Sequence, residues 1–306
     1  MKHLLLSLLI CLPGLATGTD FEKIDIPTSA NINKILFVGP AYGWAVTSDG
    51  ELLSTYNGGR TWKVKKITTR RITDITVRDR RGYLCGERGL LMKSNDRGST
   101  WQDISQPMKF NFTGISIVND SSAIVCGTDR NSMAKTRGVL FQTWDYSKTW
   151  KKHNHLGNGY VDVVTNPPHR IYLLAIKSAF HSINAGLNFI SGKYEGKHLA
   201  FAFDFDDAWG YLVGRKGFFA RSTNHGRDWT DIELEMNKNL YAISMFDHNS
   251  GIAIGEDGVI LYFENDGQKN RLVHCGHDVD LLSVFVTDTH IFCGGKNGTL
   301  LSKERK

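Results

Sequence analysis

Residues 94–101 read Ser94-Asn95-Asp96-Arg97-Gly98-Ser99-Thr100-Trp101, and this string is the clearest of five similar copies in a chain of 306 residues. The other copies are T-Y-N-G-G-R-T-W at residues 55–62, T-W-D-Y-S-K-T-W at 143–150, S-I-N-A-G-L-N-F at 182–189 and S-T-N-H-G-R-D-W at 222–229. Their final aromatic residues are 39, 49, 39 and 40 positions apart, and a sixth, eroded copy surrounds residues 265–267. A period of about 40 residues indicates a repeat architecture.

Each copy has the composition of a tight turn. An Asp or Asn side chain can accept hydrogen bonds from backbone N–H groups just downstream, and Gly permits a positive φ. We expect the final aromatic residue to enter the next strand and to pack beneath the turn. The residues to which we assign this structural role are Asn57 and Trp62, Asp96 and Trp101, Asp145 and Trp150, Asn184 and Phe189, and Asn224 and Trp229.

Between these turns, every period contains short apolar or alternating runs that suit β-strands. In the second period the runs are residues 72–77, 82–85, 90–94 and 101–104. Four strands in about 40 residues is the size of one propeller blade. First strands begin near Ile35, Ile72, Phe112, Tyr160, Leu199, Leu240 and Leu281. The sequence therefore predicts an all-β fold, a seven-bladed β-propeller with four-stranded blades.

The two ends of the chain complete this count. After residue 281 only three strands are expected, at 282–287, 290–293 and 299–303, whereas residues 21–26 offer a spare strand. Adding the N-terminal strand as the outer strand of the last blade would close the ring and pair open strand edges. No linker or change in composition divides residues 19–306, so we predict a single propeller domain there.

Residues 1–18 have the features of a secretory signal peptide. A basic start is followed by an apolar stretch at residues 4–15 and by small residues, Ala16 and Gly18, before the expected cleavage site. Cys11 follows Ile10, where a lipoprotein site requires a small residue, so we expect no lipid anchor. No later apolar run reaches the roughly 18–20 residues that cross a bilayer. We therefore predict an exported protein, periplasmic, secreted or lumenal, that is soluble after cleavage.

Composition excludes several classes of protein. Hydrophobic residues make up 41% and charged residues 22% of the chain, which is typical of a globular protein and not of a disordered or coiled-coil one. The net charge of +6 is too small for a dedicated polybasic nucleic-acid binder.

Four cysteines follow the leader, and three of them stand before Gly at matching points of separate repeats. They are Cys85, Cys126 and Cys293, and the fourth is Cys275. Equivalent positions in separate repeats favour buried free thiols. Disulfides are the alternative, because an even number of cysteines in an exported chain can pair.

Several short sequence segments of the repeat resemble those of a known family. They are F-V-G-P-A-Y-G-W-A-V at residues 37–46, V-G-R-K-G at 213–217 and I-G-E-D-G at 254–258. These segments are similar to the blades of the photosystem II assembly and stability factor-like family, which belongs to the Asp-box propellers with bacterial neuraminidase repeats. The resemblance implies a non-enzymatic assembly factor that binds membrane proteins from the lumenal or periplasmic side. It also implies that the Asp-box turns join the third and fourth strands of each blade, away from the functional face.

The functional residues are therefore expected in the opposite turns, those between second and third strands and between consecutive blades. Residues 60–97, which supply several of these turns, hold twelve Lys or Arg against four Asp or Glu. A basic face would suit a membrane protein or assembly intermediate with acidic loops, or an anionic surface. The alternative is that the charges serve solubility. The residues assigned to partner binding are Arg70, Arg71, Arg88, Arg130, Lys135, Arg137, Lys177, Arg215, Lys216 and Lys296.

Candidate catalytic and metal-binding patterns are weak. Asp204, Asp206 and Asp207 could supply paired carboxylates for glycoside hydrolysis, but a solvated turn is the preferred interpretation. Asp74 and Asp162 occupy matching points of innermost strands and could line the central channel. The string H-C-G-H at residues 274–277 lacks a second pair of ligands at zinc spacing.

We therefore expect no enzyme activity, no cofactor and no metal, and we expect a monomer that binds no nucleic acid. The alternative function is a carbohydrate-active Asp-box propeller, either a lectin or a glycosidase. An aromatic-lined cleft with two carboxylates about 5–9 Å apart would favour that alternative.

Overall fold

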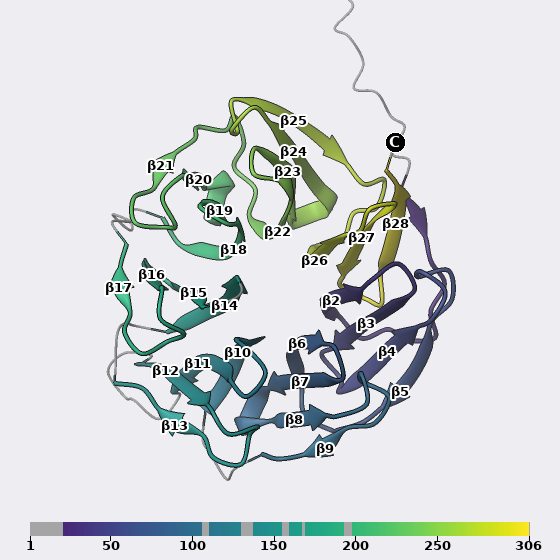
Figure 1. The fold of residues 1–306 in the computed structure, drawn as a ribbon. Coiled ribbons are helices and arrows are strands. Elements are labelled where there is room, and N and C mark those ends of the chain that lie inside the picture. The colour runs from purple at the N-terminus through teal and green to yellow at the C-terminus, as the bar shows by residue number, and fades with distance from the viewer. Residues whose placement is uncertain are drawn as a thin grey trace, which may run out of the picture.

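A computed structural model of the chain describes residues 21–105, 110–129, 137–154, 159–166, 169–192 and 198–305. These residues form seven antiparallel sheets of four strands each, arranged as a ring around a central channel (Figure 1). The predicted seven-bladed propeller is confirmed. Among the described residues, no helix is both long and apolar enough to cross a membrane.

In every blade the strands run in order from the channel to the rim, and we number the blades 1 to 7 from the one that starts with β2. The innermost strands are β2 (Ile32–Val38), β6 (Ile72–Arg78), β10 (Phe110–Ile117), β14 (Tyr160–Asn166), β18 (Ala200–Asp206), β22 (Leu240–Asp247) and β26 (Leu281–Val286). The second strands are β3 (Tyr42–Thr47), β7 (Arg81–Gly86), β11 (Ala123–Asp129), β15 (Arg170–Ala175), β19 (Trp209–Gly214), β23 (Ser250–Gly255) and β27 (His290–Gly295). The third strands are β4 (Glu51–Thr55), β8 (Leu91–Ser94), β12 (Arg137–Thr143), β16 (Ser178–Ser182), β20 (Phe219–Ser222), β24 (Val259–Glu264) and β28 (Leu300–Glu304). The outermost strands are β5 (Lys63–Lys66), β9 (Gln102–Asp103), β13 (Lys151–Lys152), β17 (Ile190–Ser191), β21 (Thr230–Asp231), β25 (Lys269–His274) and, in blade 7, β1 (Glu22–Lys23).

The N-terminal strand closes the ring, as predicted, by pairing with the C-terminal strand. Glu22 on β1 lies opposite Ser302 on β28, and the backbone N–H of Ile24 donates to Leu300 O at 2.8 Å. The ladder is shorter than the predicted strand at residues 21–26, because the chain then leaves the rim. Ile24 and Ile26 instead pack on the core between blades 7 and 1.

All seven innermost strands share an irregularity near their first residue, where the pairing with the second strand skips one position. In β6 the skipped residue is Thr73. A β-bulge of this kind breaks the alternation of side chains along a strand. Consecutive residues can therefore both reach the next blade: Thr73 Oγ1 donates to Phe112 O at 2.8 Å, and Asp74 also contacts β10.

The core lies between neighbouring blades, where apolar side chains of adjacent sheets pack face to face. Between blades 5 and 6, for example, the ring of Phe263 lies 4.6 Å from that of Tyr211 and 5.2 Å from that of Phe219. The four cysteines among the described residues, Cys85, Cys126, Cys275 and Cys293, are buried and form no disulfide, which confirms the prediction of free thiols. Burial raises the pKa of each thiol.

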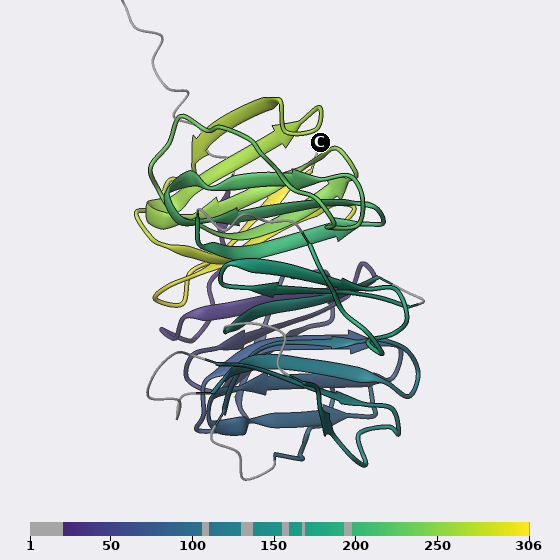
Figure 2. The ribbon, with the colours of Figure 1, turned by 90° about the vertical axis from the view of Figure 1, so that its left-hand side faces the viewer.

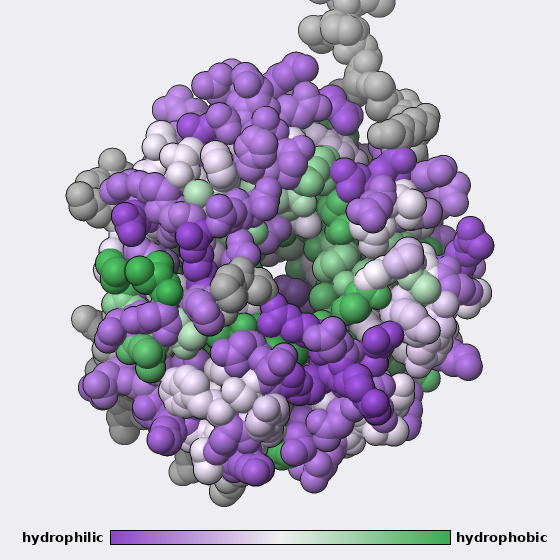
Figure 3. All heavy atoms as spheres, in the orientation of Figure 1, coloured by the Kyte–Doolittle hydropathy of each residue, from purple (hydrophilic) through white to green (hydrophobic). Residues whose placement is uncertain are grey.

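Because neighbouring strands are antiparallel, their connections emerge on two opposite faces of the ring (Figure 2). We call the face with the turns between second and third strands and the connections between blades the loop face. The opposite face carries the hairpins between first and second strands and the Asp-box turns, and we call it the box face. Figures 1 and 3 look onto the box face.

The Asp-box turns are held by one repeated set of hydrogen bonds. In blade 2, Asp96 Oδ1 accepts the backbone N–H of Thr100 at 2.8 Å, and Trp101 Nε1 donates to Gly98 O at 3.0 Å. The same backbone contact is made by Asn57, Asp145, Asn184 and Asn224 in the other copies. Hydrogen bonds from the Thr side chain and backbone lower the pKa of Asp96 and of Asp145 to about 2.

Candidate functional site

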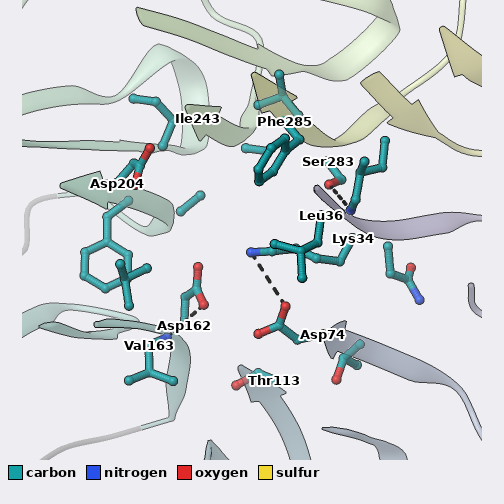
Figure 4. Close-up of a pocket in the computed structure, with 18 of the residues that line it drawn as sticks. Lys34, Leu36, Asp74, Thr113, Asp162, Val163, Asp204, Ile243, Ser283 and Phe285 are labelled. Carbon is teal, nitrogen blue, oxygen red and sulfur yellow. Dashed lines mark hydrogen bonds and ion pairs between the residues drawn. The ribbon is translucent and has the colours of Figure 1, made fainter. Parts of the chain in front are cut away.

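The innermost strands enclose a cavity of about 370 Å³ in the central channel (Figure 4). All seven blades contribute to its wall, and much of the wall is uncharged, as at Leu36 and Phe285. The charged side chains in the wall are Lys34, Asp74, Asp162 and Asp204. The prediction that Asp74 and Asp162 line the channel is confirmed.

Lys34 extends from β2 into the channel between two acidic side chains (Figure 4). Its Nζ lies 3.7 Å from Asp74 Oδ1. Attraction to Asp74, helped by Asp162, raises the pKa of Lys34 above its ordinary value, although burial opposes this shift. The ammonium group is therefore charged at any pH near neutrality.

Asp74 is nearly buried and ties together two blades. Its Oδ1 accepts the backbone N–H of Ile75, and its Oδ2 accepts the backbone N–H of Ile115 on β10, both at 2.8 Å. Both oxygens are thus occupied by backbone donors. The carboxylate fixes the innermost strand of blade 2 against that of blade 3.

Asp162 is the channel carboxylate with the fewest partners. Its Oδ1 accepts the backbone N–H of Val163 at 2.8 Å, and its side chain points toward Lys34 (Figure 4). Burial raises the pKa of Asp162 to about 6; Lys34 opposes the shift and Asp74 adds to it. A carboxyl group with such a pKa can exchange a proton near neutral pH.

The interpretation of Asp204 as part of a solvated turn is wrong. Strand β18 continues to Asp206, so Asp204 lies inside the strand and lines the cavity. Its carboxylate accepts the backbone N–H of Phe205 and that of Met245 on β22, both at 2.9 Å. Burial raises its pKa. Asp206 and Asp207 are exposed, and Asp207 pairs with Arg170 at 2.5 Å, so these residues do not form one carboxylate site with Asp204.

The channel thus holds one ammonium group and three carboxylates, of which two serve to join blades. Among the residues that the structure describes, no three His, Cys, Asp or Glu side chains lie close enough to hold a metal. His274 instead pairs with Asp278 at 3.3 Å on the rim of blade 6. The arrangement can attract a small charged group or transfer a proton at Asp162, but it has no second free carboxylate with which to act.

On the loop face, short turns present the basic residues that the sequence singled out. Arg88 lies in the 3₁₀ turn η1 (Glu87–Gly89), and Arg215 and Lys216 lie in η2 (Arg215–Gly217). All three side chains are exposed, as are Arg71 and Lys177. Within the described residues, none of these five forms a salt bridge.

Other assigned basic residues are already paired or lie elsewhere. Arg70 Nη2 lies 2.6 Å from Asp103 Oδ2, and Lys296 Nζ lies 2.5 Å from Asp280 Oδ2. Arg137 is exposed at the start of β12. The remaining two, Arg130 and Lys135, lie outside the described residues.

The basic surplus of residues 60–97 is divided between the two faces. Only Arg70, Arg71 and Arg88 belong to loop-face connections, whereas Lys63, Lys65 and Lys66 lie on the outermost strand β5. Five arginines lie at the box face, at the end of β6, in the hairpin that follows or in Asp-box turns: Arg60, Arg78, Arg80, Arg81 and Arg97. Net charge along the sequence therefore does not predict which face is basic.

Two features of the site escaped the sequence. Lys34 occupies the same point of its strand as Asp74 and Asp162, at the second position after the strand start, and this equivalence was the signal that could have revealed it. The second is Glu87, which lies in the same turn as Arg88, so blade 2 also places an acidic residue beside its cation on the loop face.

A sequence model of the family described as "Photosynthesis system II assembly factor YCF48" matches residues 15–179. The chain is 25% identical over 142 residues to the photosystem II assembly lipoprotein Ycf48 of Synechococcus sp. (strain CC9902), a match that spans 44% of this chain and 40% of that relative. It is 22% identical to the chloroplastic photosystem II stability/assembly factor HCF136 of Arabidopsis thaliana, over 80% of this chain and 68% of the relative.

Solved structures share the ring. One of YCF48 bound to a D1 peptide has a TM-score of 0.77 and 18% identity, and the match covers 95% of this chain and 97% of that one. A virginiamycin B lyase from Staphylococcus aureus also has a TM-score of 0.77, at 8% identity, covering 92% of this chain and 98% of the lyase. At such identities the likeness shows the fold alone, which serves both a binding protein and an enzyme.

Proposed function

Because the chain belongs to the photosynthesis system II assembly factor YCF48 family, we propose that it is an exported, non-enzymatic binding protein that assists the assembly or stability of a membrane protein complex. Family membership is the observation that carries this proposal. The names of the relatives give photosystem II as the complex, and one structural neighbour holds a D1 peptide. The partner proposed for this chain is a segment of a membrane protein exposed on the lumenal or periplasmic side.

The proposed binding surface is the loop face around blades 2, 4 and 5. Arg71, Arg88, Lys177, Arg215 and Lys216 are exposed there, and no described acidic residue pairs with them. Cations that form no salt bridge can receive carboxylates of a partner without first breaking an internal ion pair. Such charges speed association and select acidic partners more than they add affinity.

The channel geometry supports a non-enzymatic role. Asp74 and Asp204 each use both carboxylate oxygens to accept backbone N–H groups of two strands. A carboxylate that holds blades together cannot change its charge during a reaction without loosening the ring. This leaves Asp162 as the carboxyl group of the cavity that does not join two blades, with the strongly basic Lys34 as its charged neighbour.

Affinity capture from detergent-solubilised membranes of the host tests the proposal. The informative variant changes Arg88, Arg215 and Lys216 to Glu on the loop face. A matched control changes Lys63, Lys65 and Lys66 to Glu on β5, which alters net charge by the same amount at the rim. We expect the wild type and the rim control to capture the same discrete membrane proteins, and the loop-face variant to lose them. Equal capture by all three proteins would reject the loop face as the binding surface.

One observation favours the alternative, a carbohydrate-active propeller: Asp162 is a buried carboxyl group in a cavity, with a pKa of about 6. A general acid in glycoside hydrolysis has such a raised pKa. Incubation of the protein and of Asp162→Asn with aryl glycosides separates the two functions. Hydrolysis that the substitution abolishes would establish the enzyme.

A further inference from the structure

Exposed apolar side chains gather on the box face of blades 1, 3 and 4. They lie in or directly after the Asp-box turns, and the most exposed, Leu187, retains 70% of its accessible surface. We call this set the tip patch: Tyr56, Trp144, Tyr146, Ile183, Leu187 and Ile190. Scattered apolar residues are normal on a protein surface, but a group of large ones on one face marks an interaction site.

Blade 4 contributes the aliphatic part of the patch. Ile183, Leu187 and Ile190 are each more than half exposed, and Figure 3 shows hydrophobic side chains gathered over β16 and β17. The turn itself does not require them, because blade 2 has Asn95 and Ser99 at the positions of Ile183 and Leu187. The apolar side chains of Ile183 and Leu187 are therefore not needed for the structure of the turn, which leaves them available for an interaction.

Arginines lie level with the aromatic tips. The guanidinium of Arg81 lies 5.5 Å from the centre of the Tyr146 ring, and that of Arg97 lies 5.6 Å from the centre of the Tyr42 ring. Tyr42 in turn contacts Tyr56 edge to face at 5.9 Å. Cation–π contacts of this kind keep the charged groups beside the rings at the surface.

Backbone conformation adds a second indication. Arg97 and Tyr146 have positive φ angles of 56° and 61°, at the turn position where blade 1 has Gly58. A side chain in this conformation costs free energy that Gly would avoid. The turn has this conformation in every copy, since Ala185 and His225 share it, and in blades 2 and 3 it carries large side chains that are exposed.

The charges of this part of the box face are mixed, with a small basic excess in blades 1 to 3. The basic residues at its turns and strand ends are Arg60, Arg78, Arg80, Arg81, Arg97 and Lys148, and the acidic ones are Asp79, Asp96, Asp120 and Asp145. Asp120 is paired with Arg81 at 3.0 Å, and the carboxylates of Asp96 and Asp145 accept the hydrogen bonds of their own turns. The box turn of blade 4 has Asn184 in place of an aspartate, so the aliphatic tips have no carboxylate in their own turn.

We propose that the tip patch docks the propeller on an anionic lipid surface. The aromatic and aliphatic tips enter the boundary between head groups and acyl chains, where Trp and Tyr are preferred. The exposed arginines of the neighbouring turns that form no salt bridge with a described residue, Arg60, Arg80 and Arg97, bind lipid phosphates. Because each tip stands on the same turn of a ring of equivalent blades, the tips lie at similar height and suit a flat partner. A peptide partner would instead be expected to lie in a groove, with its own side chains in pockets.

This inference does not rest on the proposed function, because it uses the opposite face. If both hold, the protein lies on the membrane by its box face while its loop face stays free for a protein segment. The two surfaces can be tested separately, since they share no residue.

Flotation with vesicles tests the lipid surface. The chain from Thr19 onward is suitable, because all strands of the ring lie within residues 22–304 and the apolar leader would itself bind lipid. The vesicles are phosphatidylcholine, with and without phosphatidylglycerol, at low and high salt. The test variant combines Ile183→Asn with Leu187→Ser, which copies blade 2 and so preserves the turn. The control is Leu272→Ser, an exposed apolar residue of β25 on the rim of blade 6.

We expect the wild type and Leu272→Ser to bind vesicles containing phosphatidylglycerol, more weakly at high salt. The double variant should bind at least about tenfold less, because two aliphatic side chains no longer enter the lipid. The loop-face variant with Glu at residues 88, 215 and 216 should bind vesicles like the wild type. Absence of binding by the wild type, or equal binding by the double variant, would overturn the proposal and leave the patch as a protein contact.

Discussion

The carboxylate of Asp74 accepts the backbone N–H of Ile115 with Oδ2 and N 2.8 Å apart, so a single side chain joins the innermost strands of blades 2 and 3 inside the channel. Ser283 Oγ makes the same contact between blades 7 and 1, where it accepts the N–H of Ile35 at 2.8 Å. The channel wall is thus held by side-chain acceptors as well as by apolar packing. Charged groups that resemble an active site in the sequence have a structural role here.

Asp74→Asn should destabilise the ring by about 2–3 kcal/mol, because a buried charge-assisted hydrogen bond is lost and an amide NH₂ group faces a backbone donor. Urea unfolding of the two proteins measures this free energy. Asp206→Asn, at the exposed end of β18, is the control and should be neutral. A neutral Asp74→Asn would show that the contact contributes nothing to stability.

The pKa of Asp162, raised to about 6, makes stability depend on pH. Between the unfolded value of 3.8 and this value, the folded state holds a proton that the unfolded state has released, so stability falls as pH rises. Asp162→Asn should therefore stabilise the protein by roughly 1–2 kcal/mol at pH 7 and have little effect at pH 4. Unfolding curves of both proteins across this range check the sign, and a gain that is equal at both pH values would contradict it.

Asp96 and Asp145 have the opposite linkage, because hydrogen bonds in their turns lower the pKa of both to about 2. Their contribution to stability is complete above pH 3.8 and is lost as pH falls through 2. Replacing both with Asn, the residue that blades 1, 4 and 5 already use, should flatten the loss of melting temperature between pH 4 and pH 2. Thermal melts of the wild type and the double variant across this pH range test the prediction, and the melting temperature of the wild type should fall more steeply with pH. Parallel plots of melting temperature against pH would exclude a contribution from these carboxylates.

Ser147 stands where the other four boxes have Gly59, Gly98, Gly186 and Gly226, and it has a φ of 64°. Ser147→Gly should stabilise the protein by about 1 kcal/mol, because Gly adopts this conformation without strain. The reverse change, Gly98→Ser, should destabilise it by more than that, since a Cβ there would lie 2.8 Å from Nε1 of Trp44. Thermal melts of both variants test the pair, and changes of the same sign would contradict the argument.

The architecture could be predicted because the same turn recurs. Asp96, its four counterparts and the aromatic residues that follow them gave the period of one blade, the expected first strands gave the number of blades, and the spare residues 21–26 gave the closing strand. Turn chemistry is local, so it can be read from eight residues.

The channel could be predicted only in part. Asp74 and Asp162 were found by their equivalent places, but Lys34 was missed and Asp204 was assigned to a turn. The bulge at the start of each innermost strand shifts the alternation by one residue, so a period of two does not show which side chains face the channel. Which face receives each arginine depends on the turn that holds it: Arg88 and Arg97 are close in the sequence, but they lie in the turns at opposite ends of β8 and so on opposite faces.

The pairing of β1 with β28 means that the first and last strands of the ring belong to one sheet. The first strand of the ring to be synthesised, β1, therefore cannot pair until the last strand, β28, has been synthesised, and the ring cannot close while any blade is missing. A pulling force applied at either end of the ring would act on blade 7 and would open the ring by separating β1 from β28. The continuity of the ring thus depends on the pairing of β1 with β28 in blade 7 as well as on the presence of every other blade.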